Sequence, residues 1–90
     1  MVERRQKQES SEEEATFLVS LGEQIRAARQ VAGLGQEELA TRSRVHRTNL
    51  WKIEKGQLNV RILTLQRLAA APGLSVDKLL KEPAKTDSET

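Results

Sequence analysis

Cysteine is absent from this chain of 90 residues, and histidine occurs once, at His46. Without cysteine the chain can form neither a disulfide framework nor a thiolate metal site, and a single histidine has no second imidazole with which to share a metal ion. Aromatic residues are also few, because only Phe17 and Trp51 are present. We therefore expect no redox role, no metal site and no bound cofactor.

Long apolar runs are missing as well. The first fourteen residues, MVERRQKQESSEEE, contain no apolar stretch of the kind found in secretion signals, and no run approaches the roughly 18 apolar residues that cross a bilayer. No paired carboxylates, nucleophile–base set or glycine-rich phosphate loop stands out, and one small domain has little room for a cleft. We expect a cytoplasmic protein without enzymatic activity or a membrane partner.

Charge is distributed unevenly along the chain. Residues 1–14 hold three basic and five acidic residues, and residues 83–90 hold one and two, whereas residues 15–82 hold eleven basic and six acidic residues. Charge-rich segments with few apolar side chains do not form a core. We therefore expect a charged flexible arm over residues 1–14, one globular domain over residues 15–82 and a flexible tail over residues 83–90.

Most of the basic surplus falls within residues 42–61. In this segment a single acidic residue, Glu54, is accompanied by six basic ones: Arg42, Arg44, Arg47, Lys52, Lys55 and Arg61. A positive patch confined to one segment is typical of nucleic-acid binding, and a solvated basic face is the plainer alternative.

The segment from Gly35 to Gly56, GQEELATRSRVHRTNLWKIEKG, contains two short helical patterns joined by a tight basic connection. The first pattern has a narrow apolar face at Leu39 and Ala40, with Ser43 outside it, and the second has Leu50, Ile53 and Val45. Helices shorter than roughly 12 residues are marginal alone, so both must pack on other elements. This layout is typical of a DNA-reading helix-turn-helix.

Three further helices are predicted around that segment. Ser11 and Glu14 have capping-box spacing, so a long first helix is predicted from there to about Ala32, ended by Gly33. A fourth helix is predicted from Ile62 to Pro72-Gly73, and a fifth from the N-cap Ser75 to Pro83. Their expected apolar positions are Ala15, Leu18, Gly22, Ile25, Ala28, Ala32, Ile62, Leu65, Leu68, Ala69, Val76, Leu79 and Leu80.

The stretches LGEQIRAARQVAGLGQEELA, VHRTNLWKIEKGQLNV and LQRLAAAPGLSVDKLL resemble the phage-repressor-like (XRE/Cro-type) helix-turn-helix domains over about Leu21 to Leu80. The resemblance implies an all-α, lambda-repressor-like bundle of five helices without catalytic activity. It also implies a bacterial or phage protein of the nucleoid that binds operator DNA, usually as a homodimer, with the helix from about Arg47 to Lys55 in the major groove.

The chain departs from the family pattern at five positions. Arg44 stands where a left-handed turn usually has glycine, at a cost of about 1 kcal/mol or more, so an altered turn is one outcome. Gly35 and His46 replace the usual Ser or Thr caps, and histidine is the poorer cap. Val60 replaces a proline, and Leu63 exposes apolar surface that we interpret as a dimer contact, together with Leu79 of the fifth helix.

Residues at the start of a recognition helix face base edges. The expected base-contacting residues are Arg47, Thr48, Asn49, Trp51 and Lys52. For Arg47 a phosphate contact is the alternative, and for Trp51 a partner contact or packing against the fourth helix. The expected phosphate-contacting residues are Gln36, Arg42, Arg44, His46, Lys55, Gln57, Asn59 and Arg61. The resemblance further implies a buried structural salt bridge between Arg29 and Glu54.

The hypothesis is a sequence-specific transcriptional regulator, a repressor or small controller protein, that binds double-stranded DNA at a near-palindromic operator as a homodimer. One alternative is an antitoxin-like interaction module whose acidic N-terminal arm, residues 9–14, binds a protein partner. Another is a bundle that binds DNA through charge alone, without sequence preference.

Overall fold

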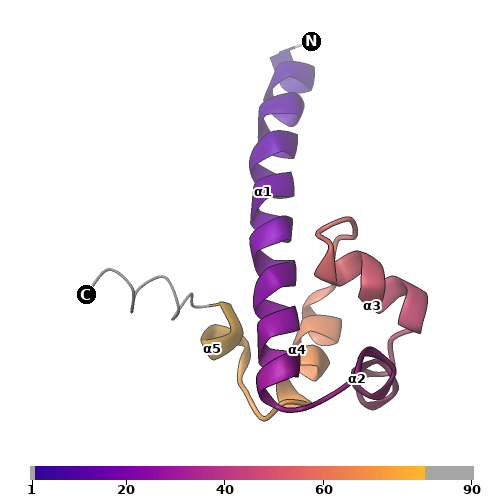
Figure 1. The fold of residues 1–90 in the computed structure, drawn as a ribbon. Coiled ribbons are helices and arrows are strands. Elements are labelled where there is room, and N and C mark those ends of the chain that lie inside the picture. Colours follow the sequence, from indigo (N-terminus) through magenta and orange to yellow (C-terminus); the bar gives the residue numbers. More distant parts are fainter. Residues whose placement is uncertain (1, 81–90) are drawn as a thin grey trace.

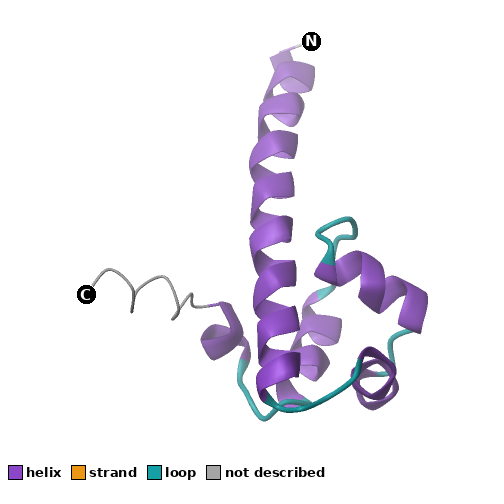
Figure 2. Cartoon of the chain, viewed as in Figure 1, coloured by secondary structure: helices purple, strands orange, loops and turns teal. Residues whose placement is uncertain are grey.

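The structure, a computed structural model, describes the backbone of residues 2–80 and the side chains of residues 12–80. Within this range it is all-α and contains no strand (Figures 1 and 2). The helices are α1 (Val2–Val31), α2 (Gln36–Ser43), α3 (Arg47–Glu54), α4 (Ile62–Ala70) and α5 (Val76–Leu80). The predicted all-α fold of five helices is confirmed. The expected stop at Pro83 and the tail over residues 83–90 lie outside the described residues.

Helix α1 begins earlier than the sequence analysis placed it. Its first residue is Val2 rather than Ser11, so most of the expected flexible arm over residues 1–14 is helical in the structure. The reason is composition, since Glu, Arg, Gln and Lys are good helix formers even where they have no apolar face to bury. The N-terminal part of α1 rises beyond the other four helices, while its later part packs against α3, α4 and α5 (Figure 1).

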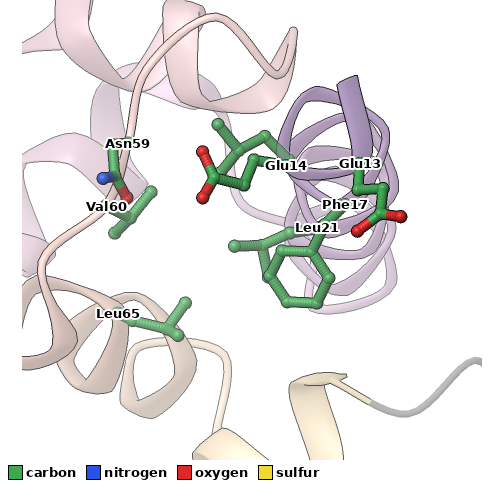
Figure 3. Close-up of a pocket in the computed structure, with 8 residues that line it drawn as sticks. Glu13, Glu14, Phe17, Leu21, Asn59, Val60 and Leu65 are labelled. Carbon is green, nitrogen blue, oxygen red and sulfur yellow. The ribbon is translucent and has the colours of Figure 1, made fainter. Parts of the chain in front are cut away.

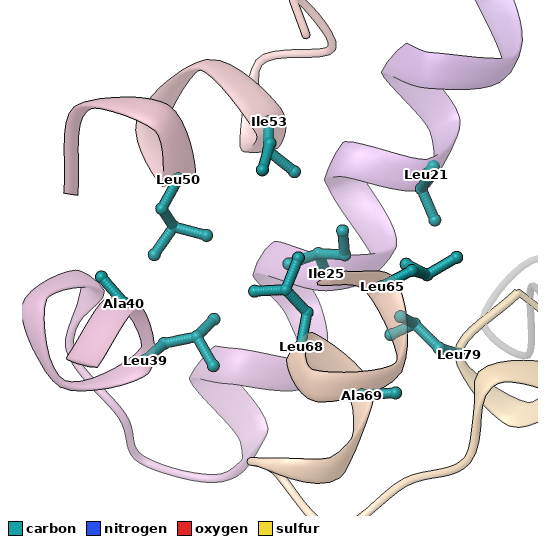
Figure 4. Packing of buried hydrophobic residues seen from close by; sticks show 10 residues of the cluster. All are labelled: Leu21, Ile25, Leu39, Ala40, Leu50, Ile53, Leu65, Leu68, Ala69 and Leu79. Atoms are coloured by element: carbon teal, nitrogen blue, oxygen red, sulfur yellow. The ribbon is translucent and has the colours of Figure 1, made fainter. Parts of the chain in front are cut away.

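The hydrophobic core lies where the five helices meet (Figure 4). Two expectations about its edge are corrected. Ser43, expected outside the apolar face of α2, is fully buried because α4 covers that flank. Ala15, Ala32, Ile62 and Leu80, expected at apolar positions, are exposed. Ala32, Ile62 and Leu80 lie at helix ends, whereas Ala15 lies within α1 on its solvent side. The buried apolar side chains are Leu21, Ile25, Leu39, Ala40, Leu50, Ile53, Leu65, Leu68, Ala69 and Leu79.

Helix α3 ends directly against α1 at Gly22. A Cβ atom at this position would lie 2.5 Å from the carbonyl oxygen of Ile53 and 2.6 Å from that of Glu54. Only glycine allows this approach of the two backbones. The C-terminal end of α3 is therefore held at a fixed place on α1.

The turn between α2 and α3 keeps a left-handed residue without glycine. Arg44 has φ 59° and ψ 39°, and among residues 2–80 it is the one non-glycine residue with positive φ. The N–H of Arg44 donates to the oxygen of Thr41 at 3.2 Å, and the N–H of Val45 donates to that of Ala40 at 2.9 Å. The turn thus has the geometry that the family pattern requires, at the expense of backbone strain at Arg44.

Within the part of the chain that the structure describes, no helix has the length and apolar character needed to cross a bilayer.

Candidate nucleic-acid interface

Helix α3 presents a polar side to solvent. Leu50 and Ile53 anchor its inner side in the core. The five expected base-contacting residues all lie on its exposed side, and these are Arg47, Thr48, Asn49, Trp51 and Lys52. One short helix therefore brings together two cationic groups, an amide, a hydroxyl and an indole, which are the groups that read base edges and thymine methyls.

His46 starts this helix by capping it. Its Nδ1 atom accepts a hydrogen bond from the backbone N–H of Thr48 at 3.2 Å. The N-cap of α2, Gly35, makes no side-chain cap bond. His46 therefore does what the usual Ser or Thr does, while the start of α2 is left uncapped.

Trp51 lies on the outer side of α3. Its side chain is 45% exposed, and the Nζ atom of Lys55 lies 5.1 Å from the centroid of its ring. A cation at this distance is attracted by the negative face of the indole. The two side chains form one exposed unit with a flat apolar part and a positive charge.

A buried polar cluster fixes the end of α3. The carboxylate of Glu54 accepts from Arg29 Nε at 2.7 Å, from Arg29 Nη2 at 3.2 Å and from Gln36 Nε2 at 3.1 Å. Arg29 Nη1 also donates to the oxygen of Leu34 at 3.0 Å. The cluster joins α1, the start of α2 and the end of α3, so that the expected Arg29–Glu54 salt bridge has a third member.

The bond from Gln36 to Glu54 was missed by the sequence analysis, which assigned Gln36 to a phosphate. One proton of its amide now points into the cluster, so a contact with DNA depends on the second amide proton or on the backbone N–H groups of the first turn of α2. Gln36 and Glu54 are 18 residues apart, so the helical spacing of residues within one helix could not have revealed this bond.

The other expected phosphate-contacting residues flank α3 on two sides. Arg42, Arg44 and His46 lie at the turn before it, and Lys55, Gln57, Asn59 and Arg61 lie in the segment after it, all exposed. A crevice of about 260 Å³ is lined by members of both groups, Arg44 and His46 from the first and Asn59 and Arg61 from the second. The fold therefore brings together residues up to 19 positions apart in the sequence, from Arg42 to Arg61.

Two cations of this surface have acidic neighbours. Arg42 Nη2 lies 2.9 Å from Glu38 Oε2, and Arg47 Nη1 lies 3.9 Å from Glu37 Oε1, with all four side chains exposed. Exposed pairs of this kind contribute only about 0–1 kcal/mol to stability. Both arginines can therefore leave their carboxylates for a phosphate or a base at small cost.

Arg67 is a further residue that the sequence analysis missed. Its Nε atom donates to the backbone oxygen of Ser43 at 2.8 Å, and its Nη2 atom lies 3.5 Å from Thr64 Oγ1. The hydroxyl of Ser43 in turn donates to the oxygen of Arg67 at 3.5 Å. These bonds tie the last residue of α2 to α4 and so support the turn. The main partner of the Arg67 side chain is the backbone carbonyl of Ser43, 24 residues away, and no local sequence pattern predicts such a contact.

The two expected dimer contacts have opposite environments. Leu63 is 64% exposed, so it is available to a partner. Leu79 is only 2% exposed, because α5 turns it into the core against α1 and α4. The assignment of Leu79 to a dimer contact is therefore corrected: it is a core residue.

In this bundle α2 packs against α3, and α3 turns a polar side to solvent between two cationic segments. This arrangement defines the class of helix-turn-helix DNA-binding proteins. Residues 20–80 match the model of the helix-turn-helix domain family, and the chain belongs to this family. The predicted resemblance to XRE/Cro-type regulators is thereby confirmed.

Known proteins that are similar to this chain are regulators. The control protein C.SmaI of Serratia marcescens is 43% identical over 60 residues, which cover 67% of this chain and 71% of that protein. The structure is similar to that of the restriction-modification controller protein C.AhdI of Aeromonas hydrophila, with a TM-score of 0.67, 35% identity and coverage of 69% and 94% of the two chains. It is also similar to the clp gene regulator ClgR of Corynebacterium glutamicum, with a TM-score of 0.73, 32% identity and coverage of 81% and 78%.

Family, fold and site agree on the general function. The chain is a DNA-binding transcriptional regulator of the helix-turn-helix type. Its relatives are named as regulators rather than as enzymes. Residues 1–19 precede the family match, so the match begins within α1.

Proposed function

We propose that this regulator binds a near-palindromic operator as a homodimer and acts at the nucleoid as a repressor or small controller protein. The observation that carries the proposal is the combination of a polar exposed side on α3 with a buried cluster that fixes the end of the same helix. A helix held in this way presents its side chains in one geometry, which sequence-specific reading requires.

In the proposed complex α3 lies in the major groove. Arg47 and Lys52 are suited to the O6 and N7 atoms of guanine, Asn49 to the N6 and N7 atoms of adenine, and the methyl group of Thr48 to that of thymine. Trp51 supplies an apolar face for sugar or thymine methyls. Each good pair contributes about 1–3 kcal/mol of discrimination between bases.

The residues on either side of α3 hold the phosphate backbone in this proposal. The turn before the helix and the segment after it carry cationic and amide groups across the crevice described above. Such contacts fix the position of the helix on the duplex without reading sequence. They include Gln36, Arg42, Arg44, His46, Lys55, Gln57, Asn59 and Arg61.

Selection from a randomised duplex pool at about 150 mM salt tests the proposal directly, because this salt weakens binding that depends on charge alone. We expect enrichment of a near-palindrome whose half-sites are about 10 base pairs apart, with relaxed preference at defined positions for Arg47→Ala. Arg26→Ala is the matched control, since Arg26 is an exposed arginine on α1 outside the proposed interface. Binding without any enriched motif would favour the charge-only alternative.

A second candidate function uses the part of α1 that precedes the family match. Glu12, Glu13 and Glu14 are exposed on this helix and precede the family match, which favours an acidic surface for a basic protein partner, as in an antitoxin-like module. Replacing all three by glutamine keeps the helix and removes the charge. Loss of capture of a basic partner with unchanged operator binding would support this function, and loss of operator binding would speak against it.

A further inference from the structure

Two carboxylates of the first turn of α2 lie beside arginines of the proposed interface, in two different ways. Glu38 Oε2 accepts from Arg42 Nη2 at 2.9 Å, one turn along the same helix. Glu37 Oε1 lies 3.9 Å from Arg47 Nη1, so this pair reaches from α2 to the first residue of α3. Within residues 12–80 the other basic residues around α3 form no ion pair, and these are Arg44, Lys52, Lys55 and Arg61.

The position of these carboxylates at the start of α2 has a plain explanation. Negative charge in the first turn stabilises the positive end of a helix, and the N-cap of α2, Gly35, makes no side-chain cap bond. This explanation applies equally to Glu37 and Glu38. It does not account for the approach of Glu37 to α3, which brings a negative charge to a residue assigned to a base.

The separation of the pair leaves Arg47 free to donate. A distance of 3.9 Å between Nη1 and Oε1 is longer than a hydrogen bond, so the N–H groups of the guanidinium are not used by the carboxylate. The two side chains are also largely exposed, Arg47 at 66% and Glu37 at 81%. Glu37 therefore acts on Arg47 through its charge rather than through a shared proton.

A negative charge at this place affects the two DNA ligands of an arginine differently. A phosphate bound at Arg47 Nη1 would lie close to Glu37 and be repelled by it, because both groups are anionic. The O6 and N7 atoms of guanine are neutral acceptors, so they are not repelled in this way. Separating the exposed pair costs little, but the carboxylate stays on α2 and continues to disfavour phosphate.

We propose that Glu37 is a specificity-determining residue, which directs Arg47 to a base by making phosphate an unfavourable partner. Arg47 touches the base, and Glu37 is a positioning residue that acts through it. Arg47 then contributes fully to affinity only where its guanidinium meets a guanine. The inference rests on the proposed function and decides between the base contact and the phosphate contact of Arg47.

Glu37→Gln tests the inference, because it removes the charge and keeps the size of an exposed side chain. Fluorescence anisotropy measures the Kd for the selected operator and for a scrambled duplex of the same composition. We expect the Kd for the scrambled duplex to fall about fivefold, as for one charge pair at about 4 Å in water, and that for the operator to change less than about twofold.

The salt dependence gives a second measurement on the same variant. On the scrambled duplex the slope of log Kd against log salt concentration should steepen by about one, because Arg47 gains a phosphate. Circular dichroism verifies that the helices are retained. A Kd that changes by the same factor on both duplexes would overturn the proposal, since Glu37 would then add only a uniform charge.

Two other carboxylates provide matched controls. Glu38→Gln removes an equal charge from the same turn but releases Arg42, which is assigned to phosphate, so both Kd values should fall by one factor. Glu14 points from α1 toward Asn59 and Val60 across a groove that, within residues 12–80, is lined by no arginine (Figure 3). Glu14→Gln should therefore leave the ratio of the two Kd values unchanged. An equal loss of this ratio in all three variants would overturn the proposal.

The same substitution in an Arg47→Ala background tests whether Glu37 acts through Arg47. Without the guanidinium, Glu37→Gln should no longer change the ratio of the Kd for the scrambled duplex to that for the operator. A loss of this ratio as large as in the wild-type background would place the effect of Glu37 elsewhere and overturn the inference.

The failure of this inference differs from the failure of the proposed function. An enriched motif in the selected pool, together with a ratio of Kd values that Glu37→Gln does not change, would keep the proposed function and reject only the role of Glu37. A pool without any enriched motif would reject both, because there would be no specificity for Glu37 to determine.

Discussion

At the scale of single residues, the most consequential group is a buried carboxylate. Glu54 is charged, lies at the end of the recognition helix and is one of two polar residues in the buried set, the other being Ser43. Its cost of desolvation is offset by two bonds from Arg29 and one from Gln36. Such a cluster fixes geometry more than it adds net stability, because a well-packed apolar substitute is often equally stable.

Glu54→Ala is expected to lower the free energy of unfolding by about 3–5 kcal/mol, because it leaves the Arg29 guanidinium buried without its carboxylate. Urea unfolding monitored by circular dichroism measures this loss. Gln36→Ala, which removes one hydrogen bond from the same cluster, should cost only about 1 kcal/mol and serves as the comparison. An unchanged unfolding midpoint in Glu54→Ala would show that the cluster does not hold α3.

Trp51→Ala is expected to separate binding from folding. Because the indole is exposed and belongs to no core contact, the free energy of unfolding should change by less than about 1 kcal/mol. Operator binding should weaken by about 1–3 kcal/mol, measured by fluorescence anisotropy of labelled DNA. If the variant unfolds instead, Trp51 is a packing residue and its assignment to DNA is wrong.

At the scale of elements, the turn between α2 and α3 combines strain with support. Arg44 holds the left-handed conformation that glycine adopts without cost. The adjacent end of α2 is held by Arg67 of α4, through its bond to the oxygen of Ser43. Tertiary contacts thus maintain a backbone geometry that the residue at the turn disfavours.

Arg44→Gly is expected to stabilise the fold by about 0.5–1 kcal/mol. The substitution removes the steric cost of positive φ, and this gain exceeds the conformational entropy that glycine loses on folding. Its operator affinity should nevertheless fall, because a proposed phosphate contact is lost. Thermal unfolding and anisotropy titration of the same sample give both values. A lower unfolding temperature would mean that the arginine side chain contributes packing that outweighs the strain.

At the scale of the whole molecule, the basic surplus is concentrated in one segment of the chain. Residues 42–61 contain six basic residues and one acidic residue, and that acidic residue, Glu54, is buried. The exposed surface around α3 therefore has a basic surplus, although Glu37 and Glu38 of α2 lie beside Arg47 and Arg42. The part of α1 that precedes the family match exposes Glu12, Glu13 and Glu14. A basic surplus of this kind attracts DNA to the surface around α3.

The salt dependence of operator binding should report the number of phosphates held. Arg61→Gln is expected to reduce the slope of log Kd against log salt concentration by about one, since each lost phosphate contact releases one counterion fewer. Arg26→Gln, which removes a charge of equal size from α1, should leave the slope unchanged. Equal slopes in wild type and Arg61→Gln would place Arg61 outside the contact with the backbone.

Much of the fold was predicted from local patterns. The bounds of α2 to α4 and the start of α5 follow from caps, glycines and apolar spacing over a few residues. The exposure of Arg47, Asn49 and Lys52 follows too, because Leu50 and Ile53 fix which side of α3 is inside. The start of α1 could not be obtained in this way. Residues 2–14 have helix-forming side chains but no apolar periodicity, and the charge pattern favoured a flexible arm.

The sequence by itself determined the class of this protein: five helices, a turn that demands a left-handed residue, and a basic recognition helix with one apolar side. These features depend on interactions between residues close along the chain. Only the tertiary structure decided that Leu79 packs in the core, that Ser43 is buried beneath α4 and that Gln36 donates to Glu54. Each of these depends on which surfaces meet when helices distant in the sequence pack together, and spacing along one helix does not carry that information.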